Sequence, residues 1–241
     1  MGNAIYAALS RQSGLMSEMS VVANNIANLA TDGYRREGVT FTEHVARTGR
    51  GGGAIAMARA GAHYVDLSPG AFVETGGRFD FAIEGPGFFL VEGPEGPLLT
   101  RAGSFRGNAA GELVTAGGRR LLDAAGAAVF VPPDAREVGL GGDGTLTADG
   151  RPLARLGVFR PADPADLQRR GGAAFEAPGG VDPQPEGRIL QGFVESSNTD
   201  PVAEIARMIE VQRAYELGRG FLEREDRRLA TLIRTLGPQQ G

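Results

Sequence analysis

The residue types that could carry out acid–base or metal chemistry are few in this sequence. It has two histidines, His44 and His63, and no cysteine. The histidines lack the spacing of a metal-ligand pair, and no obvious nucleophile accompanies either of them. Each is therefore predicted to be a surface or turn residue.

Two glycine-rich segments have compositions that can occur in ligand-binding loops. Residues 49–53 could mimic a phosphate-binding loop, but no Lys-Ser/Thr pair follows them in a strand–turn–helix frame. Asp143 and Asp149 flank a glycine-rich turn that could hold a cation, but their spacing differs from that of a Ca²⁺ loop. We therefore expect a solvated hairpin there, no metal site and no cofactor.

Asparagine side chains cluster near the N-terminus. Asn25 and Asn28 are three residues apart and Asn24 and Asn28 are four apart, so in a helix they are neighbours. Such amides could bind a ligand. Because buried amides need hydrogen-bond partners, we predict instead that they bond backbone or a neighbouring copy of the chain.

The element that must position these amides is a helix over residues 3–29, which contain no proline and one glycine. Its heptad positions are spaced four and three residues apart, as in a coiled-coil seam. They are Ile5, Leu9, Gln12, Met16, Met19, Ala23 and Ile26. Thr31-Asp32-Gly33 follows, where glycine can adopt the positive φ that ends a helix.

A second helix is predicted over residues 200–236. Asp200 can cap it and Pro201 fits its first position, while Gly237-Pro238 ends it. Apolar residues recur every seven positions at Met208, Tyr215, Leu222, Leu229 and Leu236, and Ile205, Val211 and Ile233 widen the stripe. Gly218 and Gly220 lie inside this helix, where each glycine lowers the stability of the helix by about 1 kcal/mol relative to alanine. They permit either close approach of another helix or a bend.

Between the helices, residues 34–197 read as a β-rich body. Phe79, Phe81 and Ile83 alternate with polar or small residues, as in a half-buried strand, and Phe88 to Val91 follow across a Gly-Pro-Gly turn. Residues 111–119 and 144–151 each resemble a hairpin with a glycine-bearing turn. Residues 48–61 are glycine-rich and are predicted to form a mobile loop. The fold class is therefore α+β.

The overall composition excludes several classes of protein. The net charge is −4 and no basic block is present, which argues against a nucleic-acid partner. No apolar run approaches 18 residues, so no membrane span is expected. The N-terminus also lacks the layout of a cleaved secretory signal.

The apolar stripes of the two helices favour assembly. Pairing the helices with each other would leave much of both stripes open, and large exposed apolar surface usually marks a partner site. Repeated head-to-tail packing without ring closure builds a filament or tube. The alternative is that both helices dock on the β body as core elements. We assign residues 1–33 and 198–241 to a helical, coiled-coil-like assembly domain and residues 34–197 to the body.

Several motifs along nearly the whole chain resemble those of flagellar rod and hook proteins. Near the N-terminus they are Val22 to Asn28 with Thr31, Gly33, Tyr34 and Arg35-Arg36; in the body, Asp80 to Phe89, Thr100 to Phe105 and Gly111 to Val114; near the C-terminus, Glu195 to Asn198 and Met208 to Glu216. Within the family the opening residues and the length are most similar to the proximal rod members, with the distal rod as the alternative. Asn198-Thr199 departs from the more usual Asn-Val.

The resemblance implies a structural subunit and no enzyme. Its helices would form the inner core of a hollow shaft that crosses the periplasm in the flagellar basal body and transmits torque from motor to hook. The implied partners are copies of itself, other rod proteins and the type III export apparatus, which takes the chain without cleavage. A cell-wall glycan-binding or hydrolysing module is the alternative of another class, although the sequence singles out no carboxylate pair for hydrolysis.

The assembly interface is predicted from the heptads and the terminal motifs together. For Arg213 and Glu216, ordinary i, i+3 pairing and contact with an adjacent subunit both remain open. The predicted interface residues are Ile5, Leu9, Met16, Met19, Asn24, Asn25, Ile26, Asn28, Met208, Gln212, Arg213, Tyr215, Leu222, Leu229 and Leu236.

Overall fold

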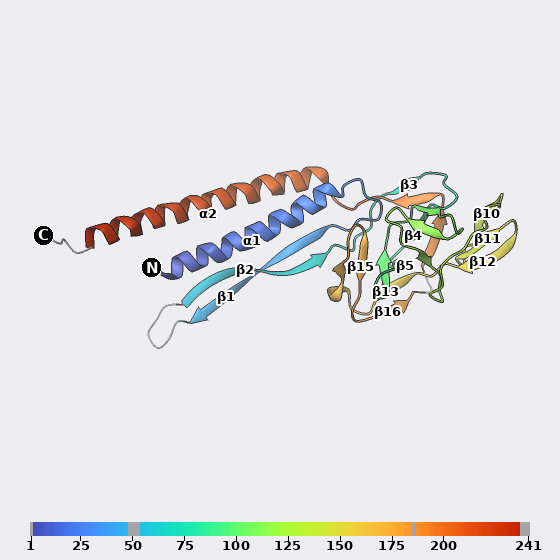
Figure 1. Ribbon diagram of the computed structural model, residues 1–241, viewed down its shortest axis with the longest axis horizontal. Helices are drawn as coiled ribbons and strands as arrows, with labels where there is room; N and C mark the ends of the chain where they lie inside the picture. The colour runs from blue at the N-terminus through green and yellow to red at the C-terminus, as the bar shows by residue number, and fades with distance from the viewer. Residues whose placement is uncertain (1, 48–53, 185–186, 237–241) are drawn as a thin grey trace. The chain divides into compact units, whose positions relative to one another are not determined.

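The computed structural model describes residues 2–47, 54–184 and 187–236, and its two long helices lie at the two ends of the chain (Figure 1). Helix α1 spans Gly2–Ala27 and helix α2 spans Pro201–Leu236. Both predicted helices are confirmed. The chain leaves α1 through Gly33, whose φ of 65° is the left-handed conformation predicted there. A side chain is impossible at this position, because a Cβ atom would lie 2.1 Å from the backbone of Arg101.

The strands between the helices confirm a strand-rich central region and an α+β fold. They are β1 (Glu37–Arg47), β2 (Ala54–Val65), β3 (Phe72–Glu74), β4 (Phe81–Glu84), β5 (Phe89–Glu92), β6 (Pro97–Thr100), β7 (Phe105–Gly107), β8 (Leu113–Thr115), β9 (Leu121–Leu122), β10 (Val138–Leu140), β11 (Thr145–Ala148), β12 (Arg151–Arg155), β13 (Phe159–Pro161), β14 (Gln168–Arg169), β15 (Ala174–Glu176), β16 (Val181–Pro183), β17 (Arg188–Gln191) and β18 (Phe193–Glu195). A short 3-10 helix occupies Pro164–Asp166.

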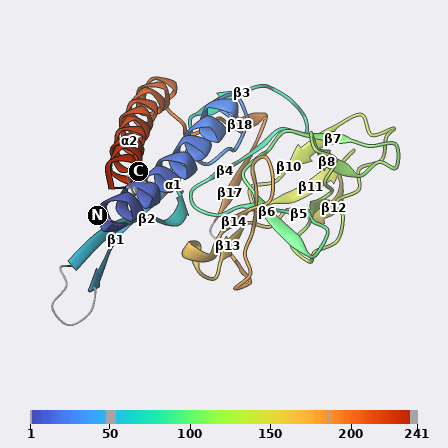
Figure 2. The ribbon, with the colours of Figure 1, turned by 60° about the vertical axis from the view of Figure 1, so that its left-hand side comes forward.

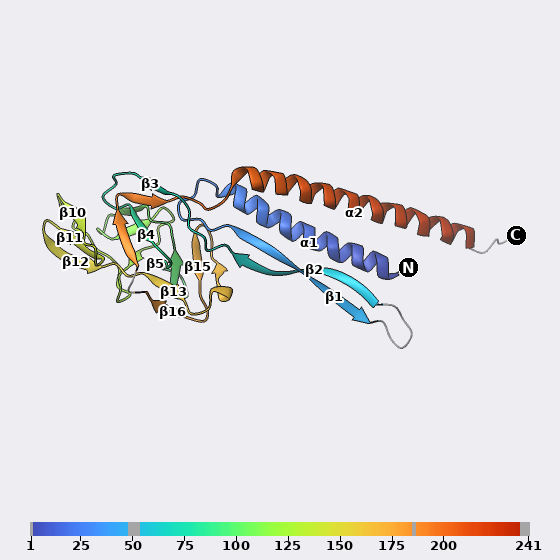
Figure 3. The same ribbon diagram turned by 180° about the vertical axis from the view of Figure 1, so that it is seen from behind.

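The chain folds into two compact units that are discontinuous in sequence. Unit 1 comprises residues 1–26, 37–64 and 201–241, and unit 2 comprises residues 27–36 and 65–200. Unit 1 therefore holds both helices and the β1–β2 hairpin, which lies alongside α1 in Figures 1, 2 and 3. The hairpin falls within residues 34–197, the range that the sequence assigns to the body.

The prediction of a glycine-rich loop over residues 48–61 is wrong for residues 54–61. Strand β2 begins at Ala54 and pairs with β1 in a two-stranded sheet. Small residues can occupy a strand as well as a loop, and pairing with β1 supplies the hydrogen bonds that composition does not reveal. Residues 49–53, weighed above as a phosphate-binding loop, lie outside the described residues.

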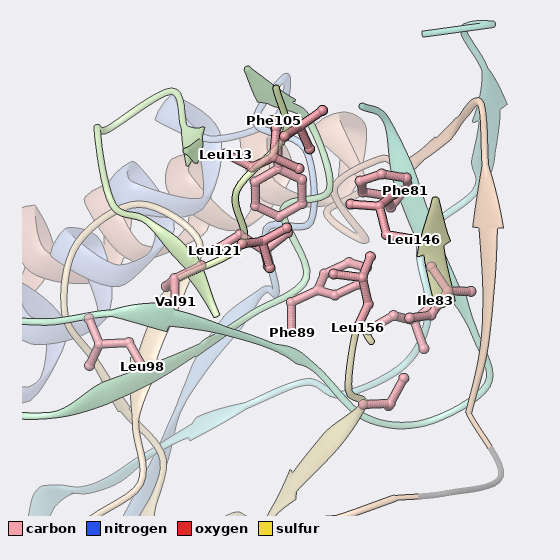
Figure 4. Close-up of a cluster of buried hydrophobic side chains, with 14 of the residues drawn as sticks. Phe81, Ile83, Phe89, Val91, Leu98, Phe105, Leu113, Leu121, Leu146 and Leu156 are labelled. Carbon is pink, nitrogen blue, oxygen red and sulfur yellow. The ribbon is translucent and has the colours of Figure 1, made fainter. Parts of the chain in front are cut away.

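Unit 2 is built on a five-stranded antiparallel sheet in the order β14-β15-β6-β5-β9. Its main core gathers side chains from strands that are distant in sequence, including Phe81, Phe89, Phe105, Leu121 and Leu146 (Figure 4). A smaller cluster on the sheet contains Phe88, Leu99 and Phe175 among others.

Strand β4 differs from its predicted half-buried pattern, because Phe81, Ala82 and Ile83 are all fully buried. Both faces of this strand are therefore covered. The second predicted hairpin is confirmed: β11 pairs with β12 across Asp149 and Gly150, both of which have positive φ.

Candidate functional site

The surface that α1 buries inside unit 1 includes polar residues. Leu15, Glu18, Val22 and Asn25 are buried at the three- and four-residue spacing of one helix face. On α2 the buried residues are Glu204 and Val211, also seven apart. The packed face of each helix thus combines apolar and polar groups.

Three polar contacts hold the two helices together and fix their direction. Gln12 Nε2 donates to the Tyr215 carbonyl at 3.1 Å, Arg207 Nε donates to Glu18 Oε1 at 2.6 Å, and Asn25 Nδ2 donates to Glu204 Oε2 at 3.2 Å. As the residue number rises along α1, from 12 to 18 to 25, the number of its partner on α2 falls, from 215 to 207 to 204, so the helices are antiparallel. In that register the last turns of α2 extend beyond the start of α1, as Figure 1 shows.

The predicted heptad of α1 does not coincide with the face that the chain buries. Ile5, Met19 and Ile26 are half-buried, but Leu9 and Met16 are each 50% exposed. Leu9, Met16 and Ala23 form an exposed column with seven-residue spacing, which we call the α1 outer column. The heptad pattern missed the buried face because Glu18 and Asn25 interrupt it with polar residues.

The predicted residues of α2 divide in a similar way. Met208, Tyr215, Leu222 and Leu229 are half-buried, whereas Gln212 and Arg213 are exposed. The side chain of Leu236 lies outside the described residues. Val202, Ile205 and Ile209 form an exposed apolar group near the start of the helix, which we call the α2 outer patch. Arg213 and Glu216 are both exposed, and no ion pair joins them among the described contacts.

The asparagine cluster consists of residues with different environments. Asn25 is fully buried; its amide donates to the Glu37 carbonyl at 2.9 Å and its Oδ1 accepts from the Glu37 N–H at 3.0 Å. Asn24 is exposed. Asn28 is half-buried, and its Oδ1 accepts from the Thr31 hydroxyl at 3.1 Å. The backbone bonding predicted for these amides therefore holds for Asn25.

Inside unit 2, the end of the N-terminal motif meets the start of the C-terminal motif in a buried ion cluster. Glu195 accepts from Arg35 Nη2 at 2.7 Å, from Arg101 Nη1 at 3.1 Å and from the Gly70 N–H at 2.8 Å. Exposure is 1% for Arg35, 4% for Arg101 and 0% for Glu195. Burial lowers the pKa of Arg101 to about 10, an effect that Glu195 opposes and Arg35 reinforces.

Asn198 connects three backbone segments of unit 2. Its Oδ1 accepts from the Arg36 N–H at 2.7 Å, and its Nδ2 donates to the carbonyls of Asp66 at 3.0 Å and Ser68 at 2.9 Å. The Asp66 N–H also donates to the Arg36 carbonyl at 2.8 Å. One side chain therefore ties together the segments at Arg36, Asp66 and its own position.

The two glycines within α2 have different surroundings. A Cβ atom at Gly218 would lie 3.2–3.3 Å from the Gln12 amide, whereas one at Gly220 would lie 3.9 Å from Arg224 Nη1. Gly218 therefore permits close approach of α1, and helix α2 continues through both positions. Gln12 and Gly218 lie in a groove whose lining also includes the small residues Ala7, Ala8 and Ala214.

The remaining candidates for chemistry occupy ordinary environments. His63 is exposed, and the described residues contain no cluster of three or more potential metal ligands. Asp143 accepts from the hydroxyl and N–H of Thr145, and these hydrogen bonds lower the pKa of its carboxyl. No helix among the described residues has the length and hydropathy needed to cross a membrane.

The sequence analysis did not single out several residues that hold these contacts together. Arg35, Glu195 and Asn198 lie within the recognised motifs but were not among the predicted interface residues, and neither were Arg101, Glu18, Glu204 and Arg207. A charge pattern alone gives no sign of burial, because arginine and glutamate are usually exposed. For Arg35, Glu195 and Asn198 the terminal motifs were the available signal, and for Arg101 it was the motif of the body.

Family comparisons identify the regions that carry these features. The sequence-family model for the flagella basal body rod protein matches residues 5–35. The family model for the flagellar hook protein FlgE/F/G D1 domain matches residues 82–148. The model of the flagellar basal body rod FlgEFG protein C-terminal region matches residues 190–235.

Similarity to curated relatives extends over the whole chain. This chain is 34% identical over 240 residues to the flagellar basal-body rod protein FlgF of Mesorhizobium japonicum, and the alignment covers 98% of this chain and 99% of the relative. Identity to FlgF of Caulobacter vibrioides is 37% over 221 residues, covering 90% of each chain. Identity to the rod protein FlgG of Bacillus subtilis is 28% over 260 residues, covering 97% and 98%. The chain therefore belongs to the flagellar basal-body rod protein family.

Proposed function

We propose that this chain is a structural subunit of the proximal rod and that it assembles through the outward faces of α1 and α2. The observation that carries the proposal is the exposed apolar residues on both helices, away from the residues that the helices bury. Leu9 and Met16 are exposed on α1, and Val202 is 77% exposed on α2.

Assembly would cover these residues with the same surfaces of other subunits. Covering a half-exposed leucine or methionine yields on the order of 1 kcal/mol, so a column and a patch repeated around a subunit supply a cooperative interface. Coiled-coil-like packing of the helices is the geometry we propose for the assembled state, because the outer column has the seven-residue spacing of such a seam.

Mutating the α1 outer column tests this mechanism. A double variant, Leu9→Lys with Met16→Lys, should keep the secondary structure of the isolated chain, because both side chains already face outward. It should fail to restore rods and motility in cells that lack their own copy. The matched control is Leu9→Met with Met16→Leu, which keeps the column apolar and should restore both. Complete rods built from the lysine variant would refute the mechanism.

Position along the shaft and the absence of an enzymatic role are further parts of the proposal. The FlgF relatives favour the proximal rod, and the FlgG relatives make the distal rod the alternative. Labelling the subunit in purified basal bodies should place it on the motor side of the rod, whereas a label next to the hook would favour the distal position. Incubation with peptidoglycan should release no soluble fragments, and steady turnover would overturn the structural assignment.

Unit 1 is the proposed assembly domain, and other rod proteins together with the type III export apparatus are the proposed partners. The buried apolar residues described on its helices are few, which suits a route in which the chain is exported unfolded and its helices become fully ordered on assembly. Removal of residues 1–26 should abolish rod formation. The strands of unit 2 should remain folded, which circular dichroism would show. Rods built from this truncated chain would contradict the assignment.

A further inference from the structure

The buried ion cluster of unit 2 contains more positive than negative charge. Arg35 and Arg101 share a single carboxylate, that of Glu195. Asp66 is the next acid near them: burial alone would raise its pKa, but hydrogen bonds from Ser68 and the charges of Arg36 and Arg35 outweigh burial and lower it. Among the buried side chains of the cluster, two arginines thus share one carboxylate. An uncompensated buried charge is strongly unfavourable.

Backbone and aromatic groups satisfy only part of this charge. Arg101 Nη1 donates to the Ile83 carbonyl at 2.8 Å and Nη2 to the carbonyl of Gly85, and the guanidinium carbon lies 5.7 Å from the centre of the Phe88 ring. Arg35 Nε and Nη1 and Arg101 Nε have no hydrogen-bond partner among the described residues. Buried donors usually have partners, so three unsatisfied nitrogens in one cluster require an explanation.

Both arginines line the same cavity. It has a volume of about 380 Å³, and its wall also includes Phe88, Gln184 and the side chain of Arg160. Arg160 is exposed and only loosely paired, with 3.9 Å between its Nε and Asp182 Oδ2. No carboxylate is among the described residues that line the cavity. The described part of the wall therefore offers three guanidinium groups and no acid.

We propose that this cavity is an oxyanion site, in which the buried Arg35 and Arg101 supply fixed positive charge and the exposed Arg160 supplies a mobile contact at the rim. Arginine suits this role because its planar group can form two parallel hydrogen bonds to a carboxylate or phosphate. The oxyanion is either a free inorganic anion or a carboxylate side chain of a second copy of this chain. This site lies in unit 2 and is independent of the outer faces of α1 and α2.

Inorganic phosphate is the probe for the test, applied to the full chain by calorimetric titration at constant ionic strength in chloride buffer. We expect saturable binding with a stoichiometry near one. Arg160→Gln should weaken the affinity about tenfold, the loss expected for one charged hydrogen bond. Arg160 is exposed, so the variant should fold; equal circular dichroism spectra will verify this.

Arg188→Gln is the matched control. Arg188 is likewise an exposed strand arginine with a loose ion pair, 3.6 Å from Glu84, but it does not line the cavity. This variant should bind phosphate as the unmodified chain does. Absence of saturable binding, or an equal loss in the two variants, would overturn the proposal and indicate general charge screening.

Sedimentation of the same samples distinguishes the two sources of the oxyanion. If a carboxylate of a second copy occupies the site, phosphate and Arg160→Gln should both reduce self-association. If a free anion is the ligand, phosphate should bind without changing the average mass. Either result supports an oxyanion site, provided that the titration shows the predicted difference between Arg160→Gln and Arg188→Gln.

Discussion

Thr199 buries its hydroxyl without a hydrogen-bond partner among the described residues. The corresponding position in the resembling motif is more usually valine. Replacing the hydroxyl by a methyl group of the same shape removes an unsatisfied polar atom, so Thr199→Val should stabilise unit 2 by about 1 kcal/mol. Urea unfolding followed by circular dichroism measures the change.

A second buried threonine provides the opposite expectation. The Thr100 hydroxyl donates to the Ala173 carbonyl at 2.9 Å and accepts from the Ala102 N–H at 3.0 Å. Thr100→Val should therefore destabilise the unit by about 1–3 kcal/mol, because it leaves buried groups unpaired. If both valine variants shifted stability in the same direction, the assignment of Thr199 as unsatisfied would be wrong.

Glu195 is the residue whose replacement should cost most in the ion cluster. Glu195→Gln leaves Arg35 and Arg101 buried without their carboxylate, and breaking a buried pair in this way costs about 3–5 kcal/mol. The same change at Glu92, whose partner Arg120 is exposed, should cost far less, because solvent screens an exposed ion pair. Thermal unfolding of the two variants checks the contrast, and similar midpoints would show that the cluster contributes little.

Residues of this kind set the limit of prediction from sequence. The heptad of α1 did not predict the face that the helix buries, because Glu18 looks like a surface residue until Arg207 is placed beside it, and the partners of Asn25, Glu204 and Glu37, cannot be assigned from spacing. Those partners come from distant parts of the chain. Local spacing carries no information about them.

At the scale of elements, the two glycines of α2 separate helix propensity from helix packing. Gly220→Ala should raise the stability of the helix by up to about 1 kcal/mol, because its Cβ atom would make only an ordinary van der Waals contact, 3.9 Å from Arg224 Nη1. Gly218→Ala gains the same propensity but presses on Gln12, so its net effect should be smaller or unfavourable. The helical signal during thermal unfolding measures both, and a larger gain at Gly218 would contradict close packing there.

Helix ends were predictable because local chemistry determines them. Asp200 directly precedes α2 and Pro201 is its first residue, and Gly33 adopts the positive φ that the pattern required. Strand burial was harder to predict. The burial of Phe81, Ala82 and Ile83 on β4 depends on the pairing of this strand with β17, more than one hundred residues later, and on a core assembled from many separate strands.

At the scale of the whole molecule, buried apolar residues are distributed unevenly between the units. Those described in unit 1 are Leu15, Val21, Val22 and Val211, whereas unit 2 contains two hydrophobic clusters. The assignment of the β1–β2 hairpin to unit 1 could not be predicted, because the pairing of β1 with β2 is not visible in the composition of residues 37–65.

This uneven distribution predicts that unit 1 opens before unit 2 in the isolated chain. Amide hydrogens of α2 should exchange faster than those of β4 and β5, since local stability follows the amount of buried apolar contact. Hydrogen exchange read by mass spectrometry on peptides measures this order. Assembly should then slow exchange in the helices, and uniform protection across the isolated chain would contradict the prediction.

The division of the chain into discontinuous units also has a mechanical consequence. The backbone passes from one unit to the other at residues 26/27, 36/37, 64/65 and 200/201, which makes four peptide connections. A pulling or twisting force on one unit reaches the other through all four in parallel, and a single proteolytic cut leaves three intact. Asn198 binds together the segments beside three of these connections, at Arg36, Asp66 and its own position, so load on one of them is shared with the other two.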